Sequence, residues 1–380
     1  MAASTSAPPS AGGGSATSTS VPTSTVETTT PLSVATTPTV MAPSTTAAPA
    51  AVDACLDQLS LEEKVALLVW PAVDTDDWDT ARAVVGELGV GGVLLLRPRL
   101  DEGALAQRIA GLDAASRLGV LVATDEEGGD VQRLVDIEPF PSQEEVSSTM
   151  TPAAAEGLVA DHAAVVARVG VDVVLGPVVD VLPESGDPPL QRSRFFVGGP
   201  EDVAAYGGAY VRGWQSAELT PVLKHFPGHG SASADTHDAS AVTPDLASLE
   251  RRDLVPYREL VGTGAAVMIG HLTVPGLTDG LPATRSPAAV RYLRDTLGYG
   301  DALVISDALD MAASGGSIPD GAVASIAAGI DVVLFTATDQ TGAVIDAVRS
   351  AVLDGRIPPE RIDDAVRRVL AAIEQHGGGC

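Results

Sequence analysis

One segment in the middle of the chain concentrates residues that can carry acid, base and charge chemistry. Residues 224–230 read Lys-His-Phe-Pro-Gly-His-Gly, and Asp235, Thr236 and His237 follow closely. The whole chain has six histidines, so three in one short segment is a strong concentration. Proline and glycine disfavour a regular helix, and we therefore expect these side chains to sit on a loop that is available for chemistry.

Asp307 is the second candidate group. It follows the apolar run 303–305 after a single serine, in Ser306-Asp307-Ala308-Leu309, so its carboxylate should be held firmly. A fixed carboxylate can attack an anomeric carbon or stabilise an oxocarbenium-like transition state. The same residue could instead cap the helix that follows, and this motif alone does not separate the two roles.

His237 could act as a general acid and base, because an imidazole has an unperturbed pKa of about 6.5 and exchanges protons near neutral pH. Asp235 lies two residues earlier and could accept a hydrogen bond from the ring, which would fix its tautomer. The alternative is an exposed loop histidine beside a capping aspartate. Both interpretations stay open on the residues alone.

Several charged residues could bind a polar ligand. Lys224, Arg133 and Arg194 could donate charge-assisted hydrogen bonds to sugar hydroxyls or a carbonyl, and Asp125 could accept from paired hydroxyls. The alternative for Arg133 and Arg194 is an ordinary surface ion pair, the more common fate of an arginine.

A metal site is an alternative, because four neighbouring residues have ligand-type side chains: His225, His229, Asp235 and His237. Proline and glycine between the first two histidines exclude one face of a helix, the arrangement found in metalloproteases. No cysteine lies nearby, and no phosphate-binding G-x-x-x-x-G-K-[ST] motif occurs. We expect neither a metal nor a cofactor.

The elements that must position these groups alternate along the chain. Short, β-branched apolar runs without polar alternation are typical of parallel strands buried on both faces. The runs are Val65–Trp70, Val93–Leu96, Val120–Ala123, Val171–Leu175, Val222–Leu223, Ala265–Ile269, Leu303–Ile305 and Ile330–Phe335. Helical patterns lie between them, at Thr80–Leu88, Ala153–Val169, Glu201–Ala217, Pro287–Leu297 and Pro359–Glu374.

Eight strands separated by helices predict an α/β fold, a single (β/α)8 TIM-type barrel over residues 51–380, with an open doubly wound sheet as the alternative. Asp125, Lys224, His271 and Asp307 each come at or just after the end of a strand. In a barrel these ends meet at the carboxyl-terminal rim, where active sites form.

Composition excludes some partners. The 380 residues carry a formal net charge of −27, which would repel a nucleic acid backbone. No apolar run is long enough to span a bilayer. We expect a monomer, since a closed barrel needs no second copy to complete it.

Residues 1–50 consist almost entirely of Ser, Thr, Ala, Pro and Gly, with Glu27 as the one charge. Such a segment cannot bury enough apolar area to offset its conformational entropy, and it predicts a disordered stalk. A stalk suits an extracellular or surface-tethered protein, although no export signal is visible at the start of the sequence.

The two cysteines, Cys55 and Cys380, bracket the predicted barrel. They could be unrelated thiols, or they could form a disulfide that joins the two ends of a closed barrel. Sequence does not give the geometry that would decide between them.

Together, these motifs resemble glycoside hydrolase family 3, and within it the NagZ-like β-N-acetylglucosaminidase branch. The resemblance rests on the 224–230 segment with Asp235-Thr236-His237, on residues 125–133 and on residues 306–311. It extends from about Cys55 to the last helix, in the order of the family. A stalk before the barrel resembles the actinobacterial lipoprotein members of this branch.

The resemblance implies a role for each position. Asp307 would be the nucleophile and His237, paired with Asp235, the acid/base of a retaining exo-acting hydrolase that releases N-acetylglucosamine, with peptidoglycan fragments as the expected source. The residues implied to bind the terminal sugar are Asp125, Arg133, Arg194, Lys224 and His225.

Two positions depart from the family pattern. Asp130 stands where the family usually has arginine, which reverses a charge near the rim. The family's Arg-Ser-Phe reads Arg194-Phe195-Phe196, with Arg192-Ser193 just before it, so either arginine could face the pocket.

Other functions remain compatible with these residues. A phosphorylase is a close alternative, because a histidine acid/base, unlike a carboxylate, would not repel phosphate. A non-catalytic sugar-binding surface protein is the alternative from another class, although intact Asp235, His237 and Asp307 argue against a decayed site. A metalloenzyme would lose activity on chelation, and we expect no such loss.

Overall fold

The computed structural model describes residues 48–74, 76–96 and 98–380. The predicted stalk therefore lies almost wholly outside the described residues and stays a prediction. Its boundary differs slightly from the expectation, because helix α1 (Ala48–Leu56) already begins at residue 48.

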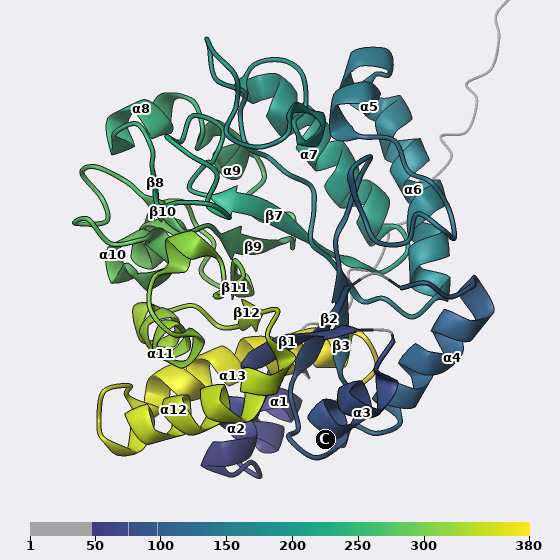
Figure 1. Cartoon of the computed structure of the whole chain (residues 1–380), viewed down its shortest axis with the longest axis vertical. Helices are drawn as coiled ribbons and strands as arrows, with labels where there is room; N and C mark the ends of the chain where they lie inside the picture. The colour runs from purple at the N-terminus through teal and green to yellow at the C-terminus, as the bar shows by residue number, and fades with distance from the viewer. Residues whose placement is uncertain (1–47, 75, 97) are drawn as a thin grey trace, which may run out of the picture. The chain divides into compact units, whose positions relative to one another are not determined.

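Eight parallel strands form the centre of the fold (Figure 1). Their order in the sheet is β11-β9-β7-β6-β3-β2-β1-β12. A bridge between Ile305 and Val332 joins the two end strands, and the Ser306 amide donates to the Val332 carbonyl at 2.9 Å. The sheet thus closes into the predicted barrel and is not an open doubly wound sheet. The strands are β1 (Val69–Asp74), β2 (Gly92–Leu96), β3 (Leu121–Thr124), β6 (Val173–Val174), β7 (Thr220–Phe226), β9 (Ala266–Ile269), β11 (Val304–Ser306) and β12 (Val333–Phe335).

Two local predictions were wrong. The run Val65–Trp70 was expected to be a strand, but its first part ends helix α2 (Leu61–Leu67) and β1 starts at Val69. Ser60 forms a capping box with Glu63, and this start signal fixes a helix where apolar content alone is ambiguous. Lys224 and His225 were expected on a loop, but they belong to β7.

Helices surround the barrel in the predicted alternation (Figure 1). Serine, threonine or aspartate side chains cap many of their first turns, as Thr151 does for α6. The remaining helices are α3 (Trp78–Gly86), α4 (Glu102–Asp113), α5 (Gln143–Thr149), α6 (Pro152–Arg168), α7 (Pro200–Gln215), α8 (Leu246–Arg251), α9 (Val255–Glu259), α10 (Pro287–Arg291), α11 (Ile318–Ala328), α12 (Thr341–Leu353) and α13 (Pro359–Gln375). The regions expected to be helical all contain helices, with ends shifted by a few residues.

Short accessory strands shape the carboxyl-terminal end of the barrel. Strands β4 (Glu126–Gly128) and β5 (Val131–Gln132) form a small antiparallel ribbon directly after β3. Strands β8 (Ala241–Val242) and β10 (Leu272–Thr273) pair in the loops that follow β7 and β9. These ribbons give otherwise irregular loops fixed hydrogen-bond partners.

The two ends of the described chain meet at the opposite side of the barrel. Helix α1 packs against α13, and Cys55 and Cys380 form a disulfide with a Cα–Cα distance of 5.5 Å, which confirms the pairing considered from the sequence. Nearby, buried Asp331 accepts from Arg294, Arg361 and Arg368. Within the described ranges, no helix has the length and apolar character needed to cross a membrane.

Candidate active site

A pocket of about 620 Å³ opens at the carboxyl ends of the barrel strands. Apolar side chains from four strands or strand ends contribute to its wall: Leu94, Leu175, Met268 and Leu334. Every site residue predicted from the sequence lines this one pocket, namely Asp125, Arg133, Arg194, Lys224, His225, Asp235, His237 and Asp307.

Barrel topology explains this convergence. Asp125 directly follows β3, Lys224 and His225 lie near the end of β7, and Asp307 directly follows β11. Parallel strands present their carboxyl ends on the same side, so residues about 80 to 180 positions apart in sequence are brought together. His237 enters from the long loop after β7.

Five charged side chains form a continuous chain of ion pairs along the pocket. Arg133 Nη2 lies 3.0 Å from Asp125 Oδ2, and Lys224 Nζ lies 3.0 Å from Asp125 Oδ1. Lys224 also lies 2.7 Å from Glu127 Oε1. Arg194 completes the chain, because its Nε and Nη2 donate to the two oxygens of Glu127 at 2.8 Å each. Signs alternate along it, so each charge has an opposite neighbour.

These pairs decide the ionisation of buried groups. Burial on its own raises the pKa of Asp125, but Lys224 and Arg133 outweigh it and hold that pKa well below its usual range. Burial likewise raises the pKa of Glu127, and Arg194 with Lys224 reverses the shift. Burial lowers the pKa of Lys224, but its two carboxylate partners raise it overall. The pocket therefore keeps fully ionised side chains that can hydrogen-bond to ligand hydroxyls.

Asp180 fixes His225 and the segment after it. Its Oδ2 lies 2.8 Å from His225 Nδ1, and its Oδ1 accepts from the backbone amides of His225 at 3.2 Å and His229 at 2.6 Å. A carboxylate only accepts, so Nδ1 of His225 carries the proton, and Nε2 is left to face the pocket beside Arg194 at 3.5 Å. The buried Asp180 carboxylate thereby fixes the backbone at His225 and His229 and the tautomer of the His225 ring.

Asp307 is half-buried where β11 ends. Its Oδ1 accepts from the Ala308 amide at 2.9 Å. Burial on its own raises the pKa of Asp307, but the imidazoles of His225 and His271 and the Ala308 N–H favour the charged form, and the net direction is downward. Asp307 is therefore a fixed and ionised carboxylate, as a nucleophile requires.

His237 and Asp235 form a hydrogen-bonded pair at the pocket mouth. His237 Nδ1 lies 2.7 Å from Asp235 Oδ1, and the His237 amide donates to the same oxygen at 2.9 Å. The His237 side chain is 58% exposed and that of Asp235 is 23% exposed. Because Nδ1 is engaged by the carboxylate, Nε2 is the ring atom available for proton exchange.

Sequence reasoning missed two organising residues. Glu127 lies within residues 125–133, where no role was predicted for it, although its carboxylate joins Lys224 to Arg194. Asp180 was not singled out at all. Its signal was weak, because one aspartate in an apolar stretch resembles any other among the 50 acidic residues of the chain. Its partners are 45 and 49 positions away and adjoin it only in the folded protein.

The structure shows where the residues that depart from the family pattern lie. Arg194 faces the pocket and is 8% exposed, whereas Arg192 is exposed and pairs with Glu144. Asp130 lies at the surface, where its Oδ2 accepts from Ser193 Oγ at 2.9 Å. The reversed charge is thus satisfied by a hydroxyl in the same turn that carries Arg194.

The histidines considered as metal ligands are engaged elsewhere. His225 pairs with Asp180, His229 Nε2 lies 3.0 Å from Thr236 Oγ1, and His237 pairs with Asp235. Over residues 48–380, excluding positions 75 and 97, no group of three or more His, Cys, Asp or Glu side chains is arranged to hold a metal ion.

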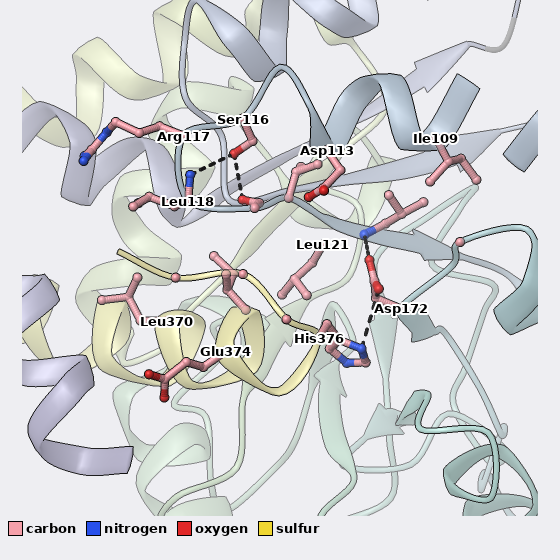
Figure 2. A pocket seen from close by; sticks show the side chains of 18 of the residues that line it. Ile109, Asp113, Ser116, Arg117, Leu118, Leu121, Asp172, Leu370, Glu374 and His376 are labelled. Carbon is pink, nitrogen blue, oxygen red and sulfur yellow. Dashed lines mark hydrogen bonds and ion pairs between the residues drawn. The ribbon is translucent and has the colours of Figure 1, made fainter. Parts of the chain in front are cut away.

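A second pocket, of about 830 Å³, lies at the other end of the barrel beside the disulfide. Figure 2 shows Asp172 beside the ring of His376, and Oδ2 of Asp172 accepts from the Val122 amide at 2.8 Å. Burial first, and the charge of Asp113 to a lesser degree, raise the pKa of Asp172 to about 7. Asp172 directly precedes β6, and Gly119 and Val120 precede β3. This pocket therefore lies at the amino-terminal end of the barrel, which contributes stability and not catalysis.

The family model and the curated relatives that match this sequence agree with one another. The model of the Glycosyl hydrolase family 3 N terminal domain matches residues 60–372. Beta-hexosaminidase LpqI of Mycobacterium tuberculosis is 38% identical over 351 residues, which cover 89% of this chain and 88% of the relative. A beta-hexosaminidase of Stenotrophomonas maltophilia is 34% identical over 281 residues, covering 70% and 82%.

Solved structures agree with the sequence relatives. Mycobacterium tuberculosis LpqI superposes with a TM-score of 0.79 at 37% identity, over 87% of this chain and 98% of that one. A family 3 β-N-acetylglucosaminidase from Paenibacillus superposes with a TM-score of 0.78 at 32% identity, over 84% of this chain and 63% of the other.

Proposed function

The chain belongs to glycosyl hydrolase family 3. We propose that the pocket at the carboxyl ends of its barrel strands binds terminal β-linked N-acetylglucosamine and that the protein removes this sugar by a retaining mechanism. The chain is a glycoside hydrolase of the β-N-acetylhexosaminidase type, as its relatives' names indicate. The observation that carries the mechanism is that Asp307 and the Asp235–His237 pair line one pocket.

In the first step, a carboxylate oxygen of Asp307 forms a bond to the anomeric carbon while the glycosidic C–O bond breaks. His237 gives the Nε2 proton to the departing oxygen, and Asp235 stabilises the changing charge on the ring through Nδ1. In the second step, His237 takes a proton from water, the water oxygen attacks the anomeric carbon, and the bond to Asp307 breaks. The sugar leaves with its original configuration.

The chain of five charged residues would hold the terminal sugar. Arg133, Asp125, Lys224, Glu127 and Arg194 present donors and acceptors in fixed positions, and His225 Nε2 adds one more acceptor beside them. A preorganised set costs little reorganisation on binding. The sugar's own polar groups would exchange water for these partners.

The experiment measures sugar release from a chromogenic β-N-acetylglucosaminide and from N-acetylglucosamine-containing disaccharides. Asp307→Asn should abolish turnover and leave the folded state intact by circular dichroism. Proton NMR of the first-formed sugar should show the β anomer. Full activity in Asp307→Asn, or an α anomer as first product, would refute the mechanism, and binding without any turnover by the wild type would indicate a non-catalytic sugar-binding protein.

Phosphorolysis stays a second candidate, because the acid/base is a histidine and not a carboxylate. Three carboxylates around the pocket mouth, Asp235, Asp238 and Asp310, work against it, since they would repel phosphate. We therefore favour water as the acceptor. An assay in phosphate buffer separates the two functions, because a phosphorylase would release the sugar 1-phosphate.

Peptidoglycan fragments outside the cytoplasm are the proposed source of substrate. The Cys55–Cys380 disulfide supports an oxidising compartment, and the Ser/Thr/Ala/Pro-rich first 50 residues suit a tether. The direct test compares release of N-acetylglucosamine from muropeptide fragments and from chitin oligosaccharides. A clear preference for chitin oligosaccharides would reject the peptidoglycan assignment without affecting the hydrolase itself.

A further inference from the structure

The loop that carries the acid/base pair is buried at one point, between the two members of the pair. Asp235 and His237 are partly and largely exposed, whereas Thr236 between them is 1% exposed. Residues 236–238 form a turn, closed by hydrogen bonds from the Asp238 and Ala239 amides to the Asp235 carbonyl, and Thr236 is the residue of this turn that faces the protein interior.

Thr236 makes two contacts to other parts of the site. Its Oγ1 lies 3.0 Å from Nε2 of His229, and its carbonyl accepts from the Ala313 amide at 3.2 Å. Ala313 belongs to a short helix, η4 (Ala312–Ser314), directly after Met311 of the pocket wall. The loop is therefore attached on one side to the segment after β7 and on the other to the segment that follows Asp307.

His229 is itself rigidly placed. It is 1% exposed, and its amide donates to Asp180 at 2.6 Å. Gly230 beside it allows an approach that no side chain would permit, because a Cβ there would lie 1.9 Å from the Val181 carbonyl oxygen. Burial lowers the pKa of His229, so its ring is neutral and interacts with the Thr236 hydroxyl as an ordinary hydrogen-bonding partner.

We propose that Thr236 is a positioning residue for proton transfer: its hydroxyl, held by His229, sets the placement of the Asp235–His237 pair over the pocket. This inference rests on the proposed hydrolase function and on His237 as its acid/base. Thr236 would not touch the substrate and would act only through its two neighbours. Loss of its hydroxyl should impair protonation of the leaving group more than attack by Asp307.

The test uses Thr236→Val, which removes the hydroxyl and keeps the shape, with Thr236→Ser as the variant that restores it. Thr243→Val is the matched control. Thr243 is also buried, at 5% exposure, and its hydroxyl donates to the Pro244 carbonyl at 2.8 Å, so this control loses a buried hydroxyl contact in the same region without contact to the acid/base pair.

Two substrates separate proton transfer from the rest of the reaction. The dinitrophenolate of a dinitrophenyl β-N-acetylglucosaminide departs without being protonated. The sugar oxygen released from an N-acetylglucosamine disaccharide must be protonated as it departs. General acid catalysis is worth roughly 100-fold to 10,000-fold. Misplacing the acid in Thr236→Val should therefore lower kcat/KM on the disaccharide, which reports the first step alone, by about 10-fold or more. The activated substrate should lose less than about 3-fold, and Thr236→Ser and Thr243→Val should behave like the wild type.

A second readout needs no turnover. With 15N-labelled histidine, the backbone amide of His237 can be followed by NMR relaxation. Thr236→Val should make this amide more mobile and leave the amide of His162 on α6 unchanged. Equal losses on both substrates, no loss on either, or unchanged mobility of His237 would overturn the inference. If the wild type cleaved neither substrate while the mobility changed as expected, the proposed function would fail and the anchoring by Thr236 would stand.

Discussion

Removing the Cys55–Cys380 disulfide should destabilise the protein strongly and leave its catalysis unchanged. The bond joins residues separated by 325 positions, so reduction frees a very long loop in the unfolded chain. The chain-entropy relation gives about 6 kcal/mol for a loop of this size, and measured losses for native disulfides are commonly about 2–5 kcal/mol. We expect Cys55→Ser/Cys380→Ser to lower the free energy of unfolding by about 3–6 kcal/mol.

The folded state should survive this change. Helix α1 still packs on α13, Arg367 still pairs with Asp53 at 2.8 Å, and β1 still pairs with β12. The bond also lies beside the second pocket, at the end of the barrel opposite the Asp307 pocket. Kinetic constants on a chromogenic substrate should therefore match the wild type at temperatures where both proteins are folded.

Guanidinium denaturation followed by circular dichroism measures the loss, with both single variants and the reduced wild type as controls. All four unbridged proteins should unfold at the same lower denaturant concentration. A loss below about 1 kcal/mol would refute the reasoning, since it would mean that the unfolded chain is already held compact without the bond. Free thiols in the denatured, unreduced wild type would show directly that the bond is absent.

Three further predictions concern buried charges and metals. Glu127→Gln leaves Lys224 and Arg194 without their shared carboxylate and should cost about 3–5 kcal/mol in denaturation experiments, while Glu144→Gln, which breaks an exposed pair, should cost less than about 1 kcal/mol; similar losses would contradict this. Because burial raises the pKa of Asp172 to about 7, its protonated form stabilises the fold at low pH, and this stabilisation is lost as pH rises from about 4 through about 7. The stability of Asp172→Asn relative to the wild type should therefore rise by about 2–3 kcal/mol as pH rises from about 5 to about 8, and a pH-independent difference would count against the assignment. Dialysis against a chelator should leave hydrolysis of a chromogenic substrate unchanged, and loss of activity restored by added metal would reopen the metalloenzyme alternative.

The sequence predicts the barrel and most of the pocket because both depend on strand ends. Asp125 and Asp307 directly follow strands whose apolar, β-branched residues identify them, and Lys224 lies within two residues of a strand end. Parallel strands must present these ends on one side, so their convergence needs no knowledge of the packing. The pairing of Asp235 with His237 is equally local, because only Thr236 lies between them.

The remainder depends on contacts between distant residues. Asp180 orients His225 and His229 only because the segment after β6 runs beside the end of β7, as the bridge between Val178 and Lys224 shows. The choice between Arg192 and Arg194 depends on which one reaches Glu127 across the pocket. The first residues of the Val65–Trp70 run are helical because a capping box at Ser60 and Glu63 starts helix α2 before the run. The apolar content of the run does not indicate this helix.

The short distance between Cys55 and Cys380 also means that the linear order of the elements is not needed to hold the barrel. Two Cα atoms 5.5 Å apart could be joined by a short peptide, and the chain could then be opened in the exposed turn at residues 353–356 between α12 and α13. Such a circular permutant would begin with α13, omit most of α1, pass into α2 and preserve every strand of the barrel.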